Sequence, residues 1–377
     1  MKITNVTAHC LTQKLDGNNR FDSAFSTFTE RAACLVEIET DTGLIGWGEC
    51  LGPNKVNAAI VEAMTPALIG RDPLDIEPIW FDLYSAWRDQ GQRGVTMTAQ
   101  SGIDIALWDI AGKHFGVPVY RLLGGAHRTS VPAYATGGFR PRDKDRLERL
   151  VEETAAYMAD GFTATKIKIG FGVDEDEAVI RAVRDAIGDD AELMIDANHG
   201  YDAIEAIELG RRIADCRIGW FEEPVVPEQL NAYRRVREGQ PIPVAGGETW
   251  HGRLAHRQAI EADAIDILQP DVAGCGGITE MRKIIAHAET SGIRVVPHVW
   301  GTGVNVAASL HMLATIPPQP GRHSSRDPWL EFDQTPHAYR MAVLQDPITQ
   351  TAGRVAVPDK PGLGVEIDRH VLEEFRA

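Results

Sequence analysis

Short apolar runs recur through the second half of the chain, and each run leads to a polar side chain at its end. The runs ELMID, IGWFEE, IPVAGGE, IDILQPD and IRVVPH lead to Asp196, Glu222, Glu248, Asp271 and His298. These residues are 26, 26, 23 and 27 positions apart, and the run TATKIKIG places Lys168 28 positions before the first of them. A strand, a crossover helix and two loops occupy about 25–30 residues. The pattern therefore predicts an α/β barrel whose strand ends converge on one site.

The first 130 residues follow a different pattern. Residues 1–49 alternate apolar and polar positions as strands do, and the DTG turn at 41–43 joins two such segments as in a hairpin. The apolar spacing of helices is found at residues 57–70, 77–89 and 98–114. We therefore predict three parts, which are an N-terminal α+β domain at 1–130, a barrel at 131–325 and a C-terminal segment at 326–377. The last segment is expected to close the barrel and return to the first domain.

Charge and composition narrow the range of partners. The 377 residues include 54 Asp and Glu against 38 Lys and Arg, which gives a formal net charge of −16. Nucleic acids and anionic membranes bind clustered Lys and Arg, so this balance argues against both. Neither a signal peptide nor an apolar run of about 18 residues is found, and the five Cys form no CxxC pair. We expect a soluble, cytoplasmic protein that acts on a small molecule.

Three of the strand-end residues are carboxylates on consecutive strands. Adjacent strands lie about 4.8 Å apart, so oxygens of Asp196, Glu222 and Glu248 can meet around one cation. An all-oxygen set favours Mg²⁺, with Mn²⁺ as the alternative, over Zn²⁺. Acids at strand ends also cap helices or pair with Arg, which is the structural alternative for any one of them. Glu223 is predicted to point the other way and to form a structural pair.

The remaining strand-end residues are suited to acid/base chemistry. Lys166 and Lys168 are two positions apart, so both point to the same face of one strand. Two neighbouring ammonium groups favour the neutral amine in one of them, which predicts a lowered pKa and a general base. Asp271 can fix the tautomer of His298 and raise its basicity, giving a second acid/base group. A surface strand and a buried core histidine are the structural alternatives.

The motifs KIK, DAN, FEEP, GGE, QPD and PHVWGTG, taken together, resemble those of the mandelate racemase subgroup of the enolase superfamily. The resemblance covers the whole chain. It implies an α/β fold, with a modified (β/α)7β TIM-type barrel under an N-terminal α+β capping domain. The muconate-lactonizing branch of the superfamily carries a Lys where this chain has QPD, so that branch fits less well.

The resemblance also implies roles for individual residues. It implies one Mg²⁺ per chain on the three carboxylates, with Lys168 and the pair of Asp271 and His298 as bases. It adds Asn198 as a site residue and Glu331 as a protonated hydrogen-bond donor to a substrate carboxylate. Capping-domain loops at 15–28 and 51–56 would select the substrate, and the side chains that could reach it are His199, His251, Arg93 and Arg253. The GCGG segment at 274–277 is predicted to be a turn rather than an anion site.

The implied chemistry is removal of a proton α to a carboxylate. Segments such as RDQGQRG and YATGG resemble a group of lactone cycloisomerases within this subgroup. That group opens an aldaro-lactone by β-elimination to a 3-deoxy-2-keto-hexarate, with Lys168 removing the proton and His298 returning one. An acid-sugar dehydratase or a racemase would use the same site, and a catalytically silent metal-binding protein is the non-enzyme alternative. The resemblance further implies a homo-oligomer.

Overall fold

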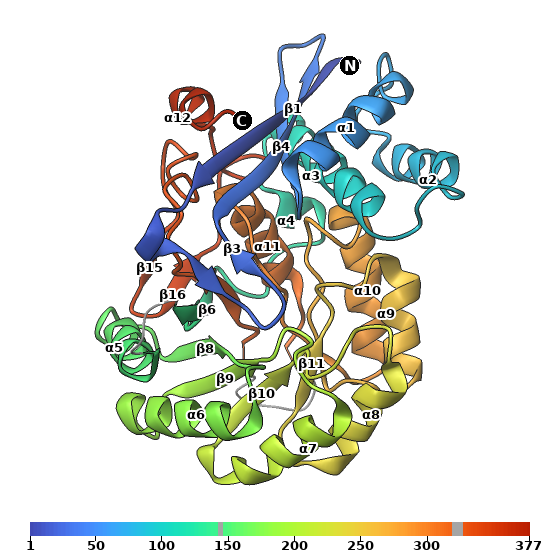
Figure 1. Ribbon diagram of the computed structural model, residues 1–377. Coiled ribbons are helices and arrows are strands. Elements are labelled where there is room, and N and C mark those ends of the chain that lie inside the picture. Colours follow the sequence, from blue (N-terminus) through green and yellow to red (C-terminus); the bar gives the residue numbers. More distant parts are fainter. Residues whose placement is uncertain (142–145, 319–326) are drawn as a thin grey trace.

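A computed structural model describes residues 1–141, 146–318 and 327–377. Figure 1 shows a smaller N-terminal part, in blue and cyan, lying over a ring of strands surrounded by helices. This arrangement confirms the predicted fold class, a capping domain on an α/β barrel. The boundary predicted between residues 325 and 326 lies outside the described residues, and the boundary at residue 130 stays a prediction.

The capping domain is built on an antiparallel sheet with the strand order β1-β4-β5. Its strands are β1 (Ile3–Lys14), β4 (Glu30–Thr40) and β5 (Ile45–Cys50). The turn at 41–44 joins β4 to β5, so the predicted hairpin is confirmed. The chain between β1 and β4 forms two short strands, β2 (Phe21–Asp22) and β3 (Thr27–Phe28), which form a second small sheet with β7 (Arg140–Pro141).

The helices of the capping domain are the three predicted ones, which begin within a few residues of the predicted starts, and a short fourth helix that was not predicted. They are α1 (Asn54–Met64), α2 (Ile76–Ala86), α3 (Val95–Phe115) and α4 (Val119–Leu122). The first helix does not continue to residue 70 as the apolar spacing predicts, because it changes to a 3₁₀ turn at Thr65–Ala67. Pro66 has no N–H to donate to the preceding turn, which explains the early end. Helix α3 is buried along most of its length because it packs between β5 and a barrel helix.

The barrel alternates eight parallel strands with seven helices among the described residues. The strands are β6 (Ser130–Thr136), β8 (Ala164–Lys168), β9 (Glu192–Asp196), β10 (Ile218–Glu222), β11 (Val244–Gly246), β12 (Ile267–Leu268), β13 (Arg294–Val295) and β14 (Leu330–Asp333). The helices are α5 (Arg146–Ala159), α6 (Val173–Ile187), α7 (Ala203–Arg212), α8 (Leu230–Gly239), α9 (Gly252–Glu261), α10 (Gly277–Thr290) and α11 (Gly303–Thr315). Strand β14 pairs with β6, so the last strand returns to the first.

The C-terminal residues return to the capping domain. Strands β15 (Gln350–Thr351) and β16 (Arg354–Ala356) form a hairpin beside β6, and α12 (Arg369–Glu374) follows. The chain then pairs with β1, where the amide of Ala377 donates to the carbonyl of Cys10. The C-terminus accordingly lies beside the capping sheet, in the same upper part of the molecule as the N-terminus (Figure 1). Across the described residues, no helix combines the length and apolar character that crossing a membrane would require.

Candidate active site

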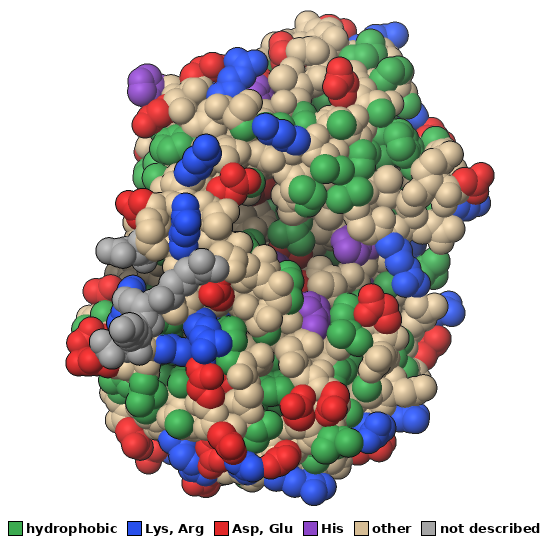
Figure 2. Space-filling view, viewed as in Figure 1, with side chains coloured by type: hydrophobic (Ala, Val, Ile, Leu, Met, Phe, Trp, Pro, Cys, Tyr) green, Lys and Arg blue, Asp and Glu red, His purple; other side chains and the backbone are tan. Residues whose placement is uncertain are grey.

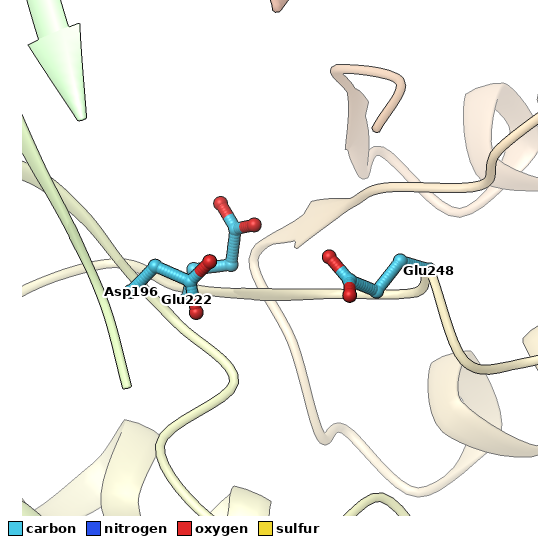
Figure 3. Close-up of side chains that lie close together, drawn as sticks. All are labelled: Asp196, Glu222 and Glu248. Atoms are coloured by element: carbon cyan, nitrogen blue, oxygen red, sulfur yellow. The ribbon is translucent and has the colours of Figure 1, made fainter. Parts of the chain in front are cut away.

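The three predicted metal ligands lie at the carboxyl ends of β9, β10 and β11. Asp196 is in register with Lys168 on one side and with Glu222 on the other. Glu248 follows β11 after Gly247, whose φ of +148° suits glycine and whose Cβ, if present, would lie 2.8 Å from the backbone of the next strand. One oxygen from each carboxylate lies within 4.8 Å of the others, and Figure 3 shows the three side chains pointing toward one another.

This cluster fits a hard divalent cation. Asp196 and Glu222 are buried, and burial raises the pKa of Glu222 to about 7 although Lys166 opposes the shift. Oε2 of Glu248 accepts no hydrogen bond from any described residue, although Nε2 of His298 lies 3.2 Å away. Three carboxylates this close repel one another, and a cation bound between them would remove that repulsion. The residues therefore match an oxygen-coordinated ion such as Mg²⁺ or Mn²⁺.

The two lysines of β8 have different surroundings. Lys168 contacts the carboxylate of Asp196 and lines a cavity of about 480 Å³ between the barrel and the capping domain. Lys166 is fully buried, with Nζ 2.5 Å from Glu222 and 2.9 Å from Glu331. Burial lowers the pKa of both lysines, but the neighbouring carboxylates outweigh it and raise the pKa of each. These carboxylates thus act on both lysines in the direction opposite to the predicted lowering of the pKa.

His298 is held by Asp271 at the opposite end of the carboxylate cluster. Its Nδ1 lies 2.7 Å from Oδ2 of Asp271, whose other oxygen accepts from the amide of Ala273. Burial lowers the pKa of His298, but Glu248, Glu331 and Asp271 together raise it to about 10. His298 lines the same cavity as Lys168, so it is not a core histidine.

Glu331 does not have the environment predicted for it. Its carboxylate accepts hydrogen bonds from Thr136 and the amide of Val299 and pairs with Lys166. Burial raises its pKa, but Lys166 and His298 outweigh burial and lower the pKa to about 2. The residue is therefore an ionised partner of Lys166 outside the cavity lining, and the prediction of a protonated donor is wrong.

Other predicted residues divide into those that line the cavity and those that do not. Asn198 and His251 line it, and the amide of Asn198 donates to Asp196. His199 lies outside the lining, with Nε2 3.2 Å from the buried carboxylate of Glu223, which is the structural pair predicted for that residue. Figure 2 shows the molecule hollowed between its upper and lower parts, with histidines nearby.

The two predicted arginines and the GCGG segment do not line this cavity. Arg93 and Arg253 line an adjoining hollow of about 120 Å³ that shares His251 with it, and there Arg253 pairs with Glu280 at 3.0 Å. In the GCGG segment, the amide of Gly276 donates to Ser101 of helix α3. The segment is thus a turn that docks α10 on the capping domain, as predicted.

Several cavity residues were not found from the sequence. Part of the cavity lining is formed by Arg31 of β4, by aromatic side chains from both parts of the molecule and by His337 after β14. These aromatic side chains are Phe25, Phe28, Phe139 and Trp300. Phe25 and Phe28 lie in the loop at 15–28 that was predicted to select the substrate, and Trp300 lies two residues after His298 in the PHVWGTG motif. Arg31, Phe139 and His337 had no sequence signal.

Comparison with known proteins extends over the whole chain. Residues 7–124 match the N-terminal domain of mandelate racemase / muconate lactonizing enzyme, and residues 149–371 match the enolase C-terminal domain-like family. A D-galactarolactone cycloisomerase of Agrobacterium fabrum is 58% identical over 376 residues, covering 100% of this chain and 99% of that protein.

Solved structures of this architecture are also similar. A 3,6-anhydro-D-galactonate cycloisomerase from Zobellia galactanivorans has a TM-score of 0.91 at 38% sequence identity. A racemase from Streptomyces coelicolor with bound magnesium has a TM-score of 0.88 at 28% sequence identity. Both comparisons cover 100% of each chain. The order of capping domain and barrel, the strand-end carboxylates and these matches lead to one conclusion. The chain belongs to the mandelate racemase and muconate lactonizing enzyme family of the enolase superfamily.

Proposed function

We propose that the protein is a Mg²⁺-dependent lactone cycloisomerase that opens an aldaro-lactone to a 3-deoxy-2-keto-hexarate. The observation that carries the proposal is the placement of Lys168 and His298 at the two ends of the carboxylate cluster, both lining one cavity. The full-length similarity to D-galactarolactone cycloisomerase supports the substrate class, an aldaro-lactone such as D-galactarolactone. We also propose a homo-oligomer, as the family resemblance implies.

Asp196, Glu222 and Glu248 would hold the ion. The all-oxygen donor set and the magnesium in the Streptomyces coelicolor racemase support Mg²⁺, with Mn²⁺ as the alternative. A bound divalent ion would supply positive charge beside the substrate carboxylate while the adjacent carbon loses its proton. The proposed role of Asn198 is to hold Asp196 in place, since its backbone N–H donates to Oδ1 at 2.8 Å and its side-chain Nδ2 donates to Oδ2 at 3.3 Å.

Lys168 is the group that we propose to remove the α-proton. Its Nζ contacts Asp196, and this carboxylate by itself favours the ammonium form. With Asp196 engaged as a metal ligand, that effect is reduced, and the neighbouring charge of Lys166 then favours the neutral amine. Lys166 keeps its own charge because it lies between Glu222 and Glu331.

His298 is the group that we propose to return a proton. Loss of the α-proton expels the ring oxygen from the β-carbon, and the resulting enol takes a proton at that carbon to become the 2-keto acid. Asp271 holds Nδ1 of His298, so Nε2 is the nitrogen that faces the cluster. The enol hydroxyl loses its proton as the β-carbon gains one, and the new carboxylate stays ionised, so one net proton passes to solvent. The product acid is an isomer of the lactone, and no redox partner is needed.

The test is incubation with D-galactaro-1,4-lactone and Mg²⁺ in D₂O, followed by proton NMR, with EDTA as the control. Metal-dependent appearance of the 3-deoxy-2-keto product supports the proposal. Exchange at the α-carbon without ring opening would instead indicate a racemase or an acid-sugar dehydratase with another substrate. If this lactone gives no exchange and no product, the proposed substrate is wrong.

A further inference from the structure

The cavity lining includes polar atoms that have no hydrogen-bond partner within the described ranges. They are Nη1 of Arg31, Oγ of Ser23 and both ring nitrogens of His337. Arg31 is 4% exposed and Ser23 is 5% exposed, so water does not readily replace the missing partners. All three residues line the cavity that also contains Lys168 and His298. Buried polar groups without partners are costly, and several around one cavity indicate that a ligand supplies them.

The charge around Arg31 is incompletely balanced. Nη2 of Arg31 lies 3.1 Å from Asp333, and Arg340 contacts the same carboxylate oxygen. Two guanidinium groups therefore share one carboxylate. Burial lowers the pKa of Arg31 to about 10 although Asp333 opposes the shift. Glu30 also lines the cavity, but its side chain is exposed to solvent. The buried wall thus has excess positive charge, which an anionic group of a ligand would balance.

The guanidinium of Arg31 is also fixed in position. It stacks on the ring of Trp300, with Cζ 4.1 Å from the ring centroid. Trp300 is two residues from His298, so the cation is anchored to the segment that carries the proposed acid. A planar, stacked guanidinium keeps its remaining N–H groups in a defined direction, which suits it to a carboxylate.

We propose that Arg31, Ser23 and His337 form a subsite for the substrate carboxyl group that is remote from the metal ligands. This inference rests on the proposed function. In an aldaro-lactone the remote carboxyl group is the lactone itself, and its ring oxygen is the leaving group. When the bond from the β-carbon to that oxygen breaks, its electron pair stays on the oxygen and the neutral ester becomes a carboxylate.

The subsite would therefore stabilise charge as it forms. The α-proton goes to Lys168, and the new carboxylate accepts hydrogen bonds from Arg31 and Ser23 without being protonated. Preorganised donors at a developing anion typically contribute about 10²- to 10³-fold to the rate. The same groups would favour sugar acids with a carboxyl group at each end over those with only one.

The kinetic test compares Arg31→Gln and Ser23→Ala with the wild type in the D₂O assay with Mg²⁺. Arg31→Gln is expected to lower the rate of ring opening by about 10²-fold or more and to lower α-proton exchange much less. Ser23→Ala removes an unpartnered atom, so it should lower ring opening several-fold without lowering Tm. Arg253→Gln is the matched control, because Arg253 also lies over an indole ring, that of Trp80, but belongs to the adjoining hollow.

A binding test separates this subsite from the proposed reaction. Calorimetry with Mg²⁺ would compare galactarate, which has two carboxylates, with galactonate, which has one. The proposal expects Arg31→Gln to weaken galactarate binding by about tenfold or more and to leave galactonate binding unchanged. If the wild type does not open the lactone but this selectivity is found, the proposed reaction is wrong and the subsite stands. The subsite proposal is wrong if Arg31→Gln loses the same affinity for galactarate and for galactonate. It is also wrong if Arg31→Gln and Ser23→Ala both keep the ring-opening rate and the ligand selectivity of the wild type.

Discussion

Among individual residues, the acid/base pair gives the most direct prediction. Lys168→Ala removes the amine at Asp196, and we expect both α-proton exchange and ring opening to fall by about 10²- to 10⁴-fold. His298→Asn leaves that amine in place, so exchange at the α-carbon should continue while the stereospecific return of deuterium to the β-carbon is lost. Proton NMR of the substrate and product in D₂O measures both quantities.

The two variants also control for each other. Both keep the three carboxylates, so binding of Mg²⁺ measured by calorimetry should persist in each. If the roles of the two residues are reversed, Lys168→Ala will exchange the α-proton normally and His298→Asn will not.

Lys166 supplies positive charge to buried carboxylates, and a bound metal ion would supply positive charge to the same cluster. It is fully buried between Glu222 and Glu331, so Lys166→Met leaves two buried carboxylates without their cation. Removal of one partner of a buried ion pair costs about 3–5 kcal/mol. We expect a lower Tm in EDTA and a larger rise in Tm on addition of Mg²⁺ than in the wild type. Equal Mg²⁺-induced shifts in the two proteins, measured by differential scanning calorimetry, would contradict this account.

At the scale of secondary-structure elements, the closest packing joins β5 to helix α3. A Cβ on Gly48 would lie 1.9 Å from the carbonyl oxygen of Gly102, so the strand and helix backbones are nearly in contact. Gly48→Ala must push them apart, and overpacking of this kind typically costs about 1–3 kcal/mol. We expect a lower urea midpoint for this variant.

Gly43→Ala is the control for this packing effect. Gly43 has a φ of +81°, and no atom lies within 4 Å of the position that a Cβ would occupy there. Alanine at this position therefore costs backbone strain alone, about 1 kcal/mol. If Gly48→Ala loses less stability than Gly43→Ala, the close contact between β5 and α3 does not restrict side-chain size at residue 48.

The elements also show why some parts of the molecule were predictable. Barrel strands appear in the sequence as short apolar runs, so Asp196, Glu222 and His298 could be placed although β12 and β13 are each only two residues long. The capping wall has no such signal. Arg31 is one charged residue in an alternating strand, and its role depends on Asp333, which is 302 positions away. The opposing effect of the carboxylates on the lysine pKa could not be predicted, because the sequence shows the paired lysines but not the distance from each to a carboxylate.

At the scale of the whole molecule, the C-terminal segment ties the capping domain to the barrel. Its strands lie beside β6, and its last residues extend the capping sheet along β1. Helix α12 adds an ion pair, because Arg369 donates to Glu37 of β4 at 2.8 Å. Since the capping domain supplies one wall of the cavity, contacts that hold the segment in place also hold that wall over the barrel.

This arrangement predicts a pH dependence of stability. Burial raises the pKa of Glu37, but hydrogen bonds from His9 and Arg369 outweigh it and lower the pKa from 4.5 to about 2. A carboxyl with a lowered folded-state pKa stabilises the fold above pH 4.5, and that contribution is lost as the pH falls from 4.5 to 2. Glu37→Gln should therefore lower the free energy of unfolding by about 2 kcal/mol near pH 7. This value is reduced because Arg369 is half exposed to solvent. Near pH 2 the variant and the wild type should have the same free energy of unfolding.

Urea unfolding at pH values from 2 to 7 measures this difference. Glu39→Gln is the matched control, because Glu39 lies on the same strand but accepts from the amide of Asn5 rather than pairing with a cation. If Glu37 anchors the returning segment, the gap between wild type and Glu37→Gln will widen between pH 2 and pH 4.5 and then stay constant. The variant should also show faster proteolysis near residue 369 at pH 7. A gap that is the same at every pH would mean that Glu37 contributes through packing rather than charge, and the segment would then be held mainly by its backbone pairing with β1.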